Sequence, residues 1–211
     1  MENGDMTYDI LKELFNISVG RAAGILSDIV QQKIILDVPN VKILDVSTDS
    51  YAIDDYISSK INGTLMVSAL SFKENYSGKA SLIFSAEKMR TFIKLCLQEE
   101  QEGSDDDMDF NDVDFDIIKE IGNIILNCIM GETGNILNIS FKYTLPEVKI
   151  FNRSDLKNDF KKTGNFYVLI LYITFIIGET EIEGAIIVDL SLNSLNDLLR
   201  KIHELEETLN E

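Results

Sequence analysis

The sequence predicts an α/β fold, an α+β sandwich in which long helices pack on a mainly antiparallel sheet. Three observations predict it. Apolar residues recur at helical spacing in several segments, runs rich in Val, Ile and Tyr lie between these segments, and the whole pattern of helix, strands and helix occurs twice. With 211 residues, of which 45% are hydrophobic, the chain can bury a core between two such layers.

In the first half, six apolar residues recur at helical spacing and predict a helix over residues 6–31. They are Ile10, Leu14, Ile17, Ala22, Ile25 and Ile29. Strands are predicted next, at residues 33–38, 41–44, 63–70 and 79–84. The last two form a hairpin turned through residues 75–78, and a second helix is expected over residues 86–97.

The second half follows residues 99–112, EEQEGSDDDMDFND, whose acidic composition predicts a solvated linker. A helix is expected over residues 113–136, with GETGN at 131–135 as the turn that ends it. Strands are predicted at residues 139–143, 147–151, 167–177 and 182–188, and a closing helix at 192–205. The last two strands form a hairpin that turns through Gly178.

The two halves are related by a nearly constant offset. Ile10 maps onto Ile117 by adding 107, and Met89 maps onto Leu195 by adding 106. Each half has apolar surface that its twin can cover, so one fused domain is expected rather than two free ones. This domain spans residues 1–211 and consists of pseudo-symmetric halves 1–98 and 113–211.

The formal net charge of −17 makes nucleic acid and anionic membrane surfaces poor partners, because both are negatively charged themselves. A protein with a basic or mixed surface is the expected partner. The longest apolar run, residues 166–177, is too short for a membrane helix and is typical of a buried strand. Cys96 and Cys128 are expected to be reduced thiols, and the N-terminus has no secretory pattern, which together favour a cytoplasmic protein.

One polar motif occurs once in each half. It consists of Asp, Glu and Asn at positions i, i+4 and i+7, which places the three side chains in a line on one helical face. The residues are Asp9, Glu13 and Asn16 in the first half and Asp116, Glu120 and Asn123 in the second. The chain has only two prolines, Pro39 and Pro146, and each lies 23 positions after the asparagine of its half (39 − 16 and 146 − 123).

A single charged stripe on a helix is most often just a solvated face, and repetition alone can be inherited symmetry. The full spacing of the motif, from the aspartate to the proline, is a more specific signal than the charged stripe alone. The CheC/CheX/FliY chemotaxis phosphatases have a signature that both copies match. It reads Asp or Ser, three residues, Glu, two residues, Asn, 22 residues and Pro. The sequence resembles this family over essentially its whole length, and its length and two-half layout are most similar to CheC. CheX-type chains carry one motif, and FliY carries a further C-terminal flagellar-switch domain.

The resemblance implies hydrolysis of the aspartyl phosphate on a CheY-like response regulator. Glu13 and Glu120 would pair with the regulator's lysine, and Asn16 and Asn123 would hold the attacking water. Asp9, Asp116, Pro39 and Pro146 would support the motif surface. An acyl phosphate has a good leaving group, so positioning of water and compensation of charge are the main needs. The Mg²⁺ would be supplied by the regulator, and no cofactor of the chain's own is expected.

Other sites are less favoured by the sequence. His203 is expected to act on the dipole of its helix rather than in catalysis, and neither cysteine has a neighbour that would make a reactive thiolate. Phe15, which stands where the second copy has Gly122, is expected to lie beside the amide of Asn16 and alter the approach of a partner. The alternative function is a non-catalytic adaptor that binds a phosphorylated regulator or CheD. A flagellar-switch component is a further alternative.

Overall fold

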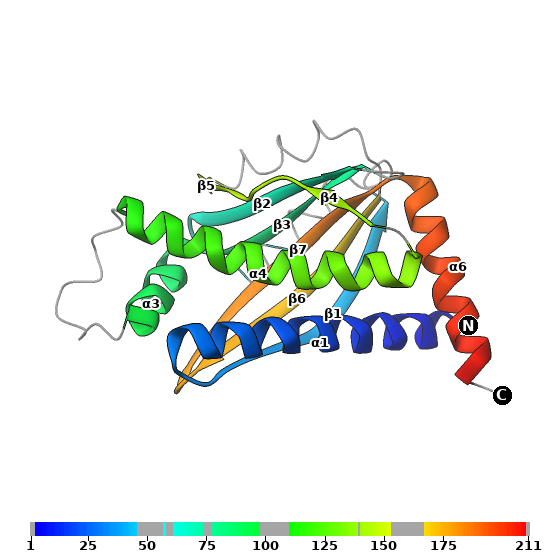
Figure 1. The fold of residues 1–211 in the computed structure, drawn as a ribbon, viewed down its shortest axis with the longest axis horizontal. Helices are drawn as coiled ribbons and strands as arrows, with labels where there is room; N and C mark the ends of the chain where they lie inside the picture. Colours follow the sequence, from blue (N-terminus) through cyan, green and yellow to red (C-terminus); the bar gives the residue numbers. More distant parts are fainter. Residues whose placement is uncertain are drawn as a thin grey trace.

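The computed structural model describes residues 3–45, 57, 61–73, 77–97, 110–138, 140–152 and 167–209 (Figure 1). The helices are α1 (Asn3–Val30), α3 (Ala86–Leu97), α4 (Asp112–Leu137) and α6 (Leu192–Leu209). The strands are β1 (Ile34–Asp45), β2 (Leu65–Lys73), β3 (Gly78–Ser85), β4 (Lys142–Tyr143), β5 (Glu147–Phe151), β6 (Tyr167–Ile177) and β7 (Thr180–Leu190). The predicted class, helices on a mainly antiparallel sheet, is confirmed.

The seven strands form one sheet in the order β1-β6-β7-β3-β2, with β4 and β5 both pairing with β2. Every pairing between these described strands is antiparallel. The first strands of each half pair with the hairpin of the other half, because β1 joins β6, and β4 and β5 join β2. Since neither half can complete its own sheet without its twin, we propose that residues 1–211 fold as a single domain.

All four described helices pack on the same face of the sheet. Residues from α1, α3, α4 and α6 belong to one continuous core with this face. A second, smaller core lies on the opposite face, where Ile57 and Ile61 pack on the strands. Strand β6 contributes to both, with Leu169 and Leu171 facing the helices and Ile170 facing away. Burial on both faces explains why this strand is apolar throughout rather than alternating.

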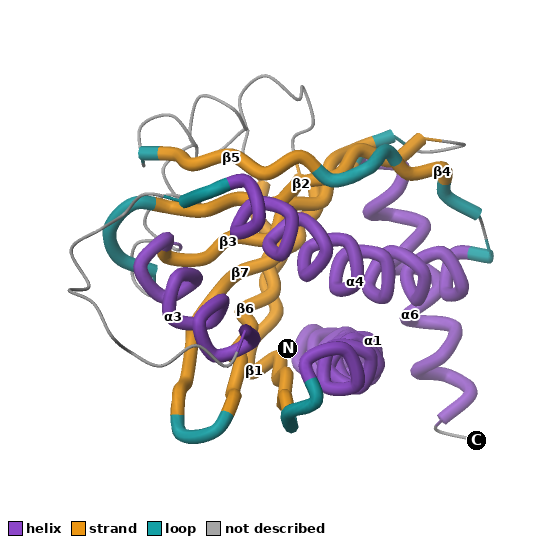
Figure 2. The backbone as a smooth tube through the Cα atoms, turned by 60° about the vertical axis from the view of Figure 1, so that its left-hand side comes forward, coloured by secondary structure: helices purple, strands orange, loops and turns teal. Residues whose placement is uncertain are grey.

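Helices α1 and α4 lie side by side and run in opposite directions across the sheet (Figures 1 and 2). Their antiparallel arrangement places Arg21 next to Glu132, with 3.1 Å between the guanidinium and carboxylate groups. Helix α3 packs near the start of α4, where Arg90 contacts Asp114 at 2.8 Å. Helix α6 contacts α1 and α4 at the opposite end (Figure 1).

Most predicted elements are confirmed, with three corrections. Helix α3 has the predicted bounds, both hairpins pair as expected, and residues 99–109 of the linker lie outside the described residues. The two strands expected on either side of Pro39 are one strand, β1, interrupted by a bulge between Asp37 and Asn40. Helix α4 continues through GETGN and ends at Asn138, whose φ of 56° provides the left-handed cap.

The buried face of α1 is the third correction. Leu11, Phe15, Ala22 and Leu26 form it, whereas three of the six apolar residues whose spacing predicted this helix are exposed. They are Ile17 (44%), Ile25 (45%) and Ile29 (58%). Two sets of apolar residues at helical spacing lie on this helix, and only the position of the sheet decides which of them is buried.

Candidate functional site

The two motifs lie on the surface of the helix pair, but the structure does not bring them together. Because α1 and α4 are antiparallel, the motif near the start of α1 is opposite the end of α4, and the reverse holds for the second motif. All four motif carboxylates are exposed and both asparagines are partly buried. The carboxylates belong to Asp9, Glu13, Asp116 and Glu120. Each motif is therefore a separate site, accessible from solvent.

Asn16 connects helix α1 to strand β1 through both ends of its side-chain amide. Its Oδ1 accepts a hydrogen bond from the Val38 N–H at 2.7 Å, and its Nδ2 donates to the Val38 carbonyl at 3.3 Å. Val38 lies in the bulge of β1, where the register with β6 skips it and Pro39. The amide of Asn16 therefore satisfies a backbone unit that the sheet leaves unpaired. In the first half, the residue that Asn16 binds is thus the one directly before Pro39.

Asn123 has a different environment, although it occupies the equivalent position. Its Oδ1 accepts a hydrogen bond from Asn127 Nδ2 at 2.8 Å. Leu145, which corresponds to Val38, is 77% exposed. Among the residues that the structure describes, Asn123 makes no hydrogen bond to the segment before Pro146. The amide of the second motif is thus held within its own helix and is not committed to the sheet.

Phe15 does not lie beside the amide at the surface, so this prediction is wrong. The side chain is 1% exposed and belongs to the core under α1. Gly122, its counterpart, is buried against strand β2, and a Cβ at this position would overlap Ser68 Oγ and lie 2.6 Å from Ser68 Cβ. The residue before each asparagine therefore faces the sheet, with a large side chain under α1 and none under α4.

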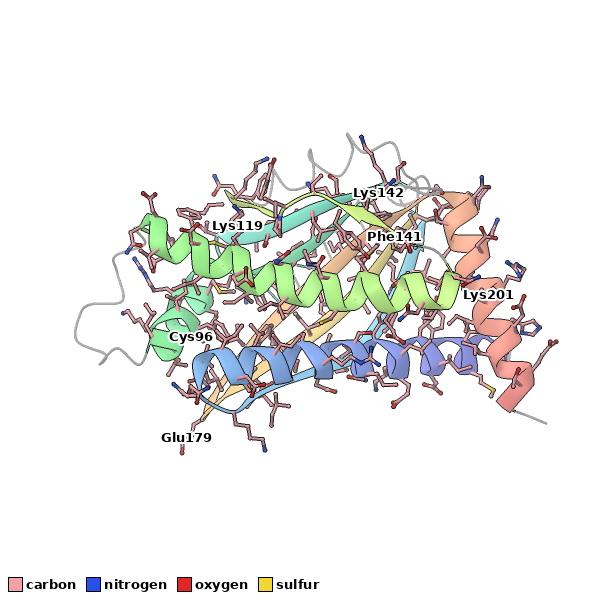
Figure 3. All side chains as sticks on the ribbon, in the orientation of Figure 1. Cys96, Lys119, Phe141, Lys142, Glu179 and Lys201 are labelled. Carbon is pink, nitrogen blue, oxygen red and sulfur yellow. The ribbon has the colours of Figure 1, made fainter. Side chains whose placement is uncertain are left out.

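An apolar recess of about 250 Å³ adjoins the second motif, and Glu120 is part of its lining. Its walls are the end of α1, the end of α3 and the first half of α4. Cys96 lies in this wall, where α3 meets α1 (Figure 3). Burial raises the pKa of the Cys96 thiol to about 12, so this group is protonated at neutral pH and is a poor nucleophile. Glu120 is the one charged residue in the described lining of this recess.

The cysteines and His203 do not form a further catalytic or metal site among the described residues. Burial also raises the pKa of Cys128, an effect that Arg21 partly offsets, and both cysteines are free thiols. His203 lies 3.4 Å from Glu206 and 3.6 Å from Glu207 on its own helix. Within the described ranges, no group of three or more His, Cys, Asp or Glu side chains is placed to hold a metal ion. None of the described helices is long and apolar enough to cross a membrane.

Sequence reasoning missed two features of the second motif helix. Asn111 caps its start, and its side chain and that of Asp114 bond reciprocally to each other's backbone N–H groups. Asn127 is the second, and it contacts the motif directly. Its signal in the sequence was a single amide in an otherwise apolar run, one helical turn after Asn123.

The bond between Asn16 and Val38 predicts a difference in stability between the two motif asparagines. Asn16→Ala should lower the free energy of unfolding by about 2 kcal/mol, because it leaves a buried N–H and C=O without partners. Asn123→Ala, the matched control, should change it by less than about 0.5 kcal/mol because it removes only a pair within one helix. Urea denaturation of both variants measures the difference. Equal losses would show that Asn16 is not a structural link.

The fold of this chain is that of the CheC/CheX/FliY class. It is similar to the crystal structure of FliY from Thermotoga maritima, with a TM-score of 0.70 and 21% identity over 94% of this chain and 94% of that chain. The FliM middle domain from H. pylori matches with a TM-score of 0.59 and 12% identity over 93% of this chain and 98% of that chain.

A chain of the FliG–FliM complex from H. pylori is also similar, with a TM-score of 0.63 and 11% identity over 91% of this chain and 96% of that chain. At these identities the similarity establishes the fold and not the activity. No protein-family model matches the sequence, and no curated protein matches it.

Proposed function

We propose that the protein is a phosphatase that hydrolyses the aspartyl phosphate of a CheY-like response regulator. In this reaction a water oxygen forms a bond to phosphorus while the bond between phosphorus and the aspartate oxygen breaks. The regulator regains a free carboxylate, and the proton that the water loses ends on the released phosphate. The main observation in favour is the complete motif, present twice and with both glutamates exposed on surface helices.

Glu120 and Asn123 are the pair that we assign to this reaction. Glu120 is exposed beside the apolar recess, where it can meet the ammonium group of a docked lysine. Asn123 lies one turn further along, with Nδ2 and one lone pair of Oδ1 left over after its bond to Asn127. A carboxamide in this position can hold a water in line with the phosphorus. Asp116 extends the contact surface by one turn on the other side.

The first motif has a different role in this proposal. The amide of Asn16 is bonded to both polar atoms of Val38, so reorienting it toward a water would require breaking two hydrogen bonds. Glu13 and Asp9 remain exposed and can still contact a partner. We therefore assign hydrolysis to the second motif and docking, with weak activity, to the first.

The partner that fits this surface has a basic rim around its phosphorylation pocket. The net charge of −17 favours such a partner and disfavours nucleic acid and anionic lipid. The Mg²⁺ in the proposed complex is the one that the regulator holds, and it compensates the charge of the phosphoryl group. In this proposal the chain itself contributes the positioning of the water by Asn123 and the carboxylate of Glu120. CheD remains a proposed second partner.

The decisive experiment mixes substoichiometric protein with a phosphorylated CheY-like regulator and follows phosphate release. The wild-type chain should accelerate release on the order of 100-fold. A variant with alanine at all four motif positions should lose this acceleration while its circular dichroism spectrum stays unchanged. The substitutions are Glu13→Ala, Asn16→Ala, Glu120→Ala and Asn123→Ala. Wild-type protein that leaves the regulator's lifetime unchanged would overturn the proposal.

A non-catalytic adaptor is the second candidate, because the FliM middle domain has the same fold. One such match comes from a complex of FliM with FliG, so this fold occurs in a protein–protein assembly. The adaptor proposal predicts binding of phosphorylated regulator or of CheD without faster turnover. Comparing binding and phosphate release in the same sample separates the two functions.

A further inference from the structure

The two halves hold their motif asparagines by different devices. In the first half, the backbone of Val38 holds Asn16, and the position one turn after Asn16 is Gly20, which has no side chain to offer. In the second half, Asn127 occupies this position (127 − 107 = 20), and its Nδ2 donates to Asn123 Oδ1 at 2.8 Å. The second motif therefore contains a fourth polar residue that the first lacks.

The bond between Asn123 and Asn127 contributes little to stability. Amide pairs at i and i+4 stabilise a helix by only a few tenths of a kcal/mol. The other end of the Asn127 amide is unfavourable, because its Oδ1 is enclosed and has no hydrogen-bond partner among the described residues. A buried acceptor without a partner destabilises a fold more than such a pair stabilises it. A buried polar residue that lowers the stability of the fold is typical of a functional site.

We propose that Asn127 is a positioning residue for the reaction at the second motif, an inference that depends on the proposed phosphatase function. Its amide occupies one lone pair of Asn123 Oδ1 and thereby fixes the rotation of that carboxamide. The remaining lone pair and the Nδ2 group of Asn123 then keep constant directions. A water held by them meets the phosphorus along one line rather than over a range of angles.

Replacing Asn127 tests this assignment, because a positioning role predicts a change in kcat without a matching change in KM. Asn127→Ala should lower kcat for phosphate release about 10-fold or more, because the amide of Asn123 becomes free to rotate, while KM changes less than about twofold. Asn127→Ser, which restores a short donor, should recover part of kcat. Gly20→Ala is the matched control at the equivalent exposed position and should leave both constants unchanged.

A second measurement does not depend on activity. The side-chain ¹⁵NH₂ signal of Asn123 should report a rigid group in the wild-type protein and a mobile one in Asn127→Ala. If that variant does not fold, Asn127→Leu, which has a similar shape and no hydrogen-bond donor, takes its place. Equal rigidity in wild type and variant, or an unchanged kcat in Asn127→Ala, would overturn the positioning role. A wild-type protein without phosphatase activity would instead overturn the proposed function, and the NMR comparison would still decide whether Asn127 holds Asn123.

Discussion

Replacing Glu120 and Asn123 together by alanine should lower the rate of regulator dephosphorylation about 100-fold, whereas the same double substitution at Glu13 and Asn16 should lower it less than about threefold. The motifs have the same residue types at the same spacing, and Phe15, which distinguishes the first copy, is buried under α1, so neither offers a basis for this difference. The structure does, because two hydrogen bonds to Val38 occupy the amide of Asn16.

The measurement is single-turnover phosphate release at saturating protein, so that weakened docking does not lower the observed rate. Because Asn16→Ala is expected to be less stable, both double variants must be assayed at a temperature where circular dichroism shows them folded. Glu13→Ala and Glu120→Ala alone provide a pair of controls that leave the asparagines in place. Equal losses from the two double variants would mean that the bond to Val38 opens readily when a regulator binds.

The second large effect concerns packing under the second motif. Gly122→Ala should lower the free energy of unfolding by about 1–3 kcal/mol, because the new methyl group overlaps Ser68 on strand β2. Both partners are buried, so neither can move into solvent. The overlap should also displace α4 outward, and the second motif with it, so phosphate release should fall along with stability.

Two controls isolate this contact. In the double variant Gly122→Ala, Ser68→Gly the space is restored, and urea denaturation should recover most of the loss. Gly20→Ala and Gly24→Ala place a methyl group on α1 where nothing lies within 4 Å. These should raise the free energy of unfolding by about 0.5–1 kcal/mol, the usual gain of alanine over glycine in a helix. A stabilising Gly122→Ala substitution would contradict the close approach of α4 to the sheet.

The elements could be predicted from the sequence wherever a signal is local. Helix α3 and both hairpins were expected close to their observed bounds, because apolar spacing, glycine and strand-forming residues act over a few neighbours. The failures have a common cause. The burial of Phe15 and the exposure of Ile17 depend on the side from which the sheet covers α1. The bulge at Pro39 depends on β6, more than a hundred residues away in the chain.

The positions of the motif residues were predictable, but their availability was not. Repetition and spacing indicated the two motifs, and the resemblance to the CheC/CheX/FliY signature singled out Glu13, Asn16, Glu120 and Asn123. On the two surface helices the glutamates are exposed and the asparagines are partly buried. The partner of each asparagine could not be read from the chain, since Val38 is available to Asn16 because the pairing of β1 with β6 skips it.

The sequence by itself determined the repeat, the helices and strands, and the two lines of polar residues, because each of these is a pattern among near neighbours. The tertiary structure decided that the halves exchange their first strands, that α4 touches the sheet at Gly122, and that Asn16 is bonded to the backbone of Val38 whereas Asn123 is bonded to the side chain of Asn127. Those features arise from contacts between segments distant in the chain, and periodicity carries no information about which distant segments meet.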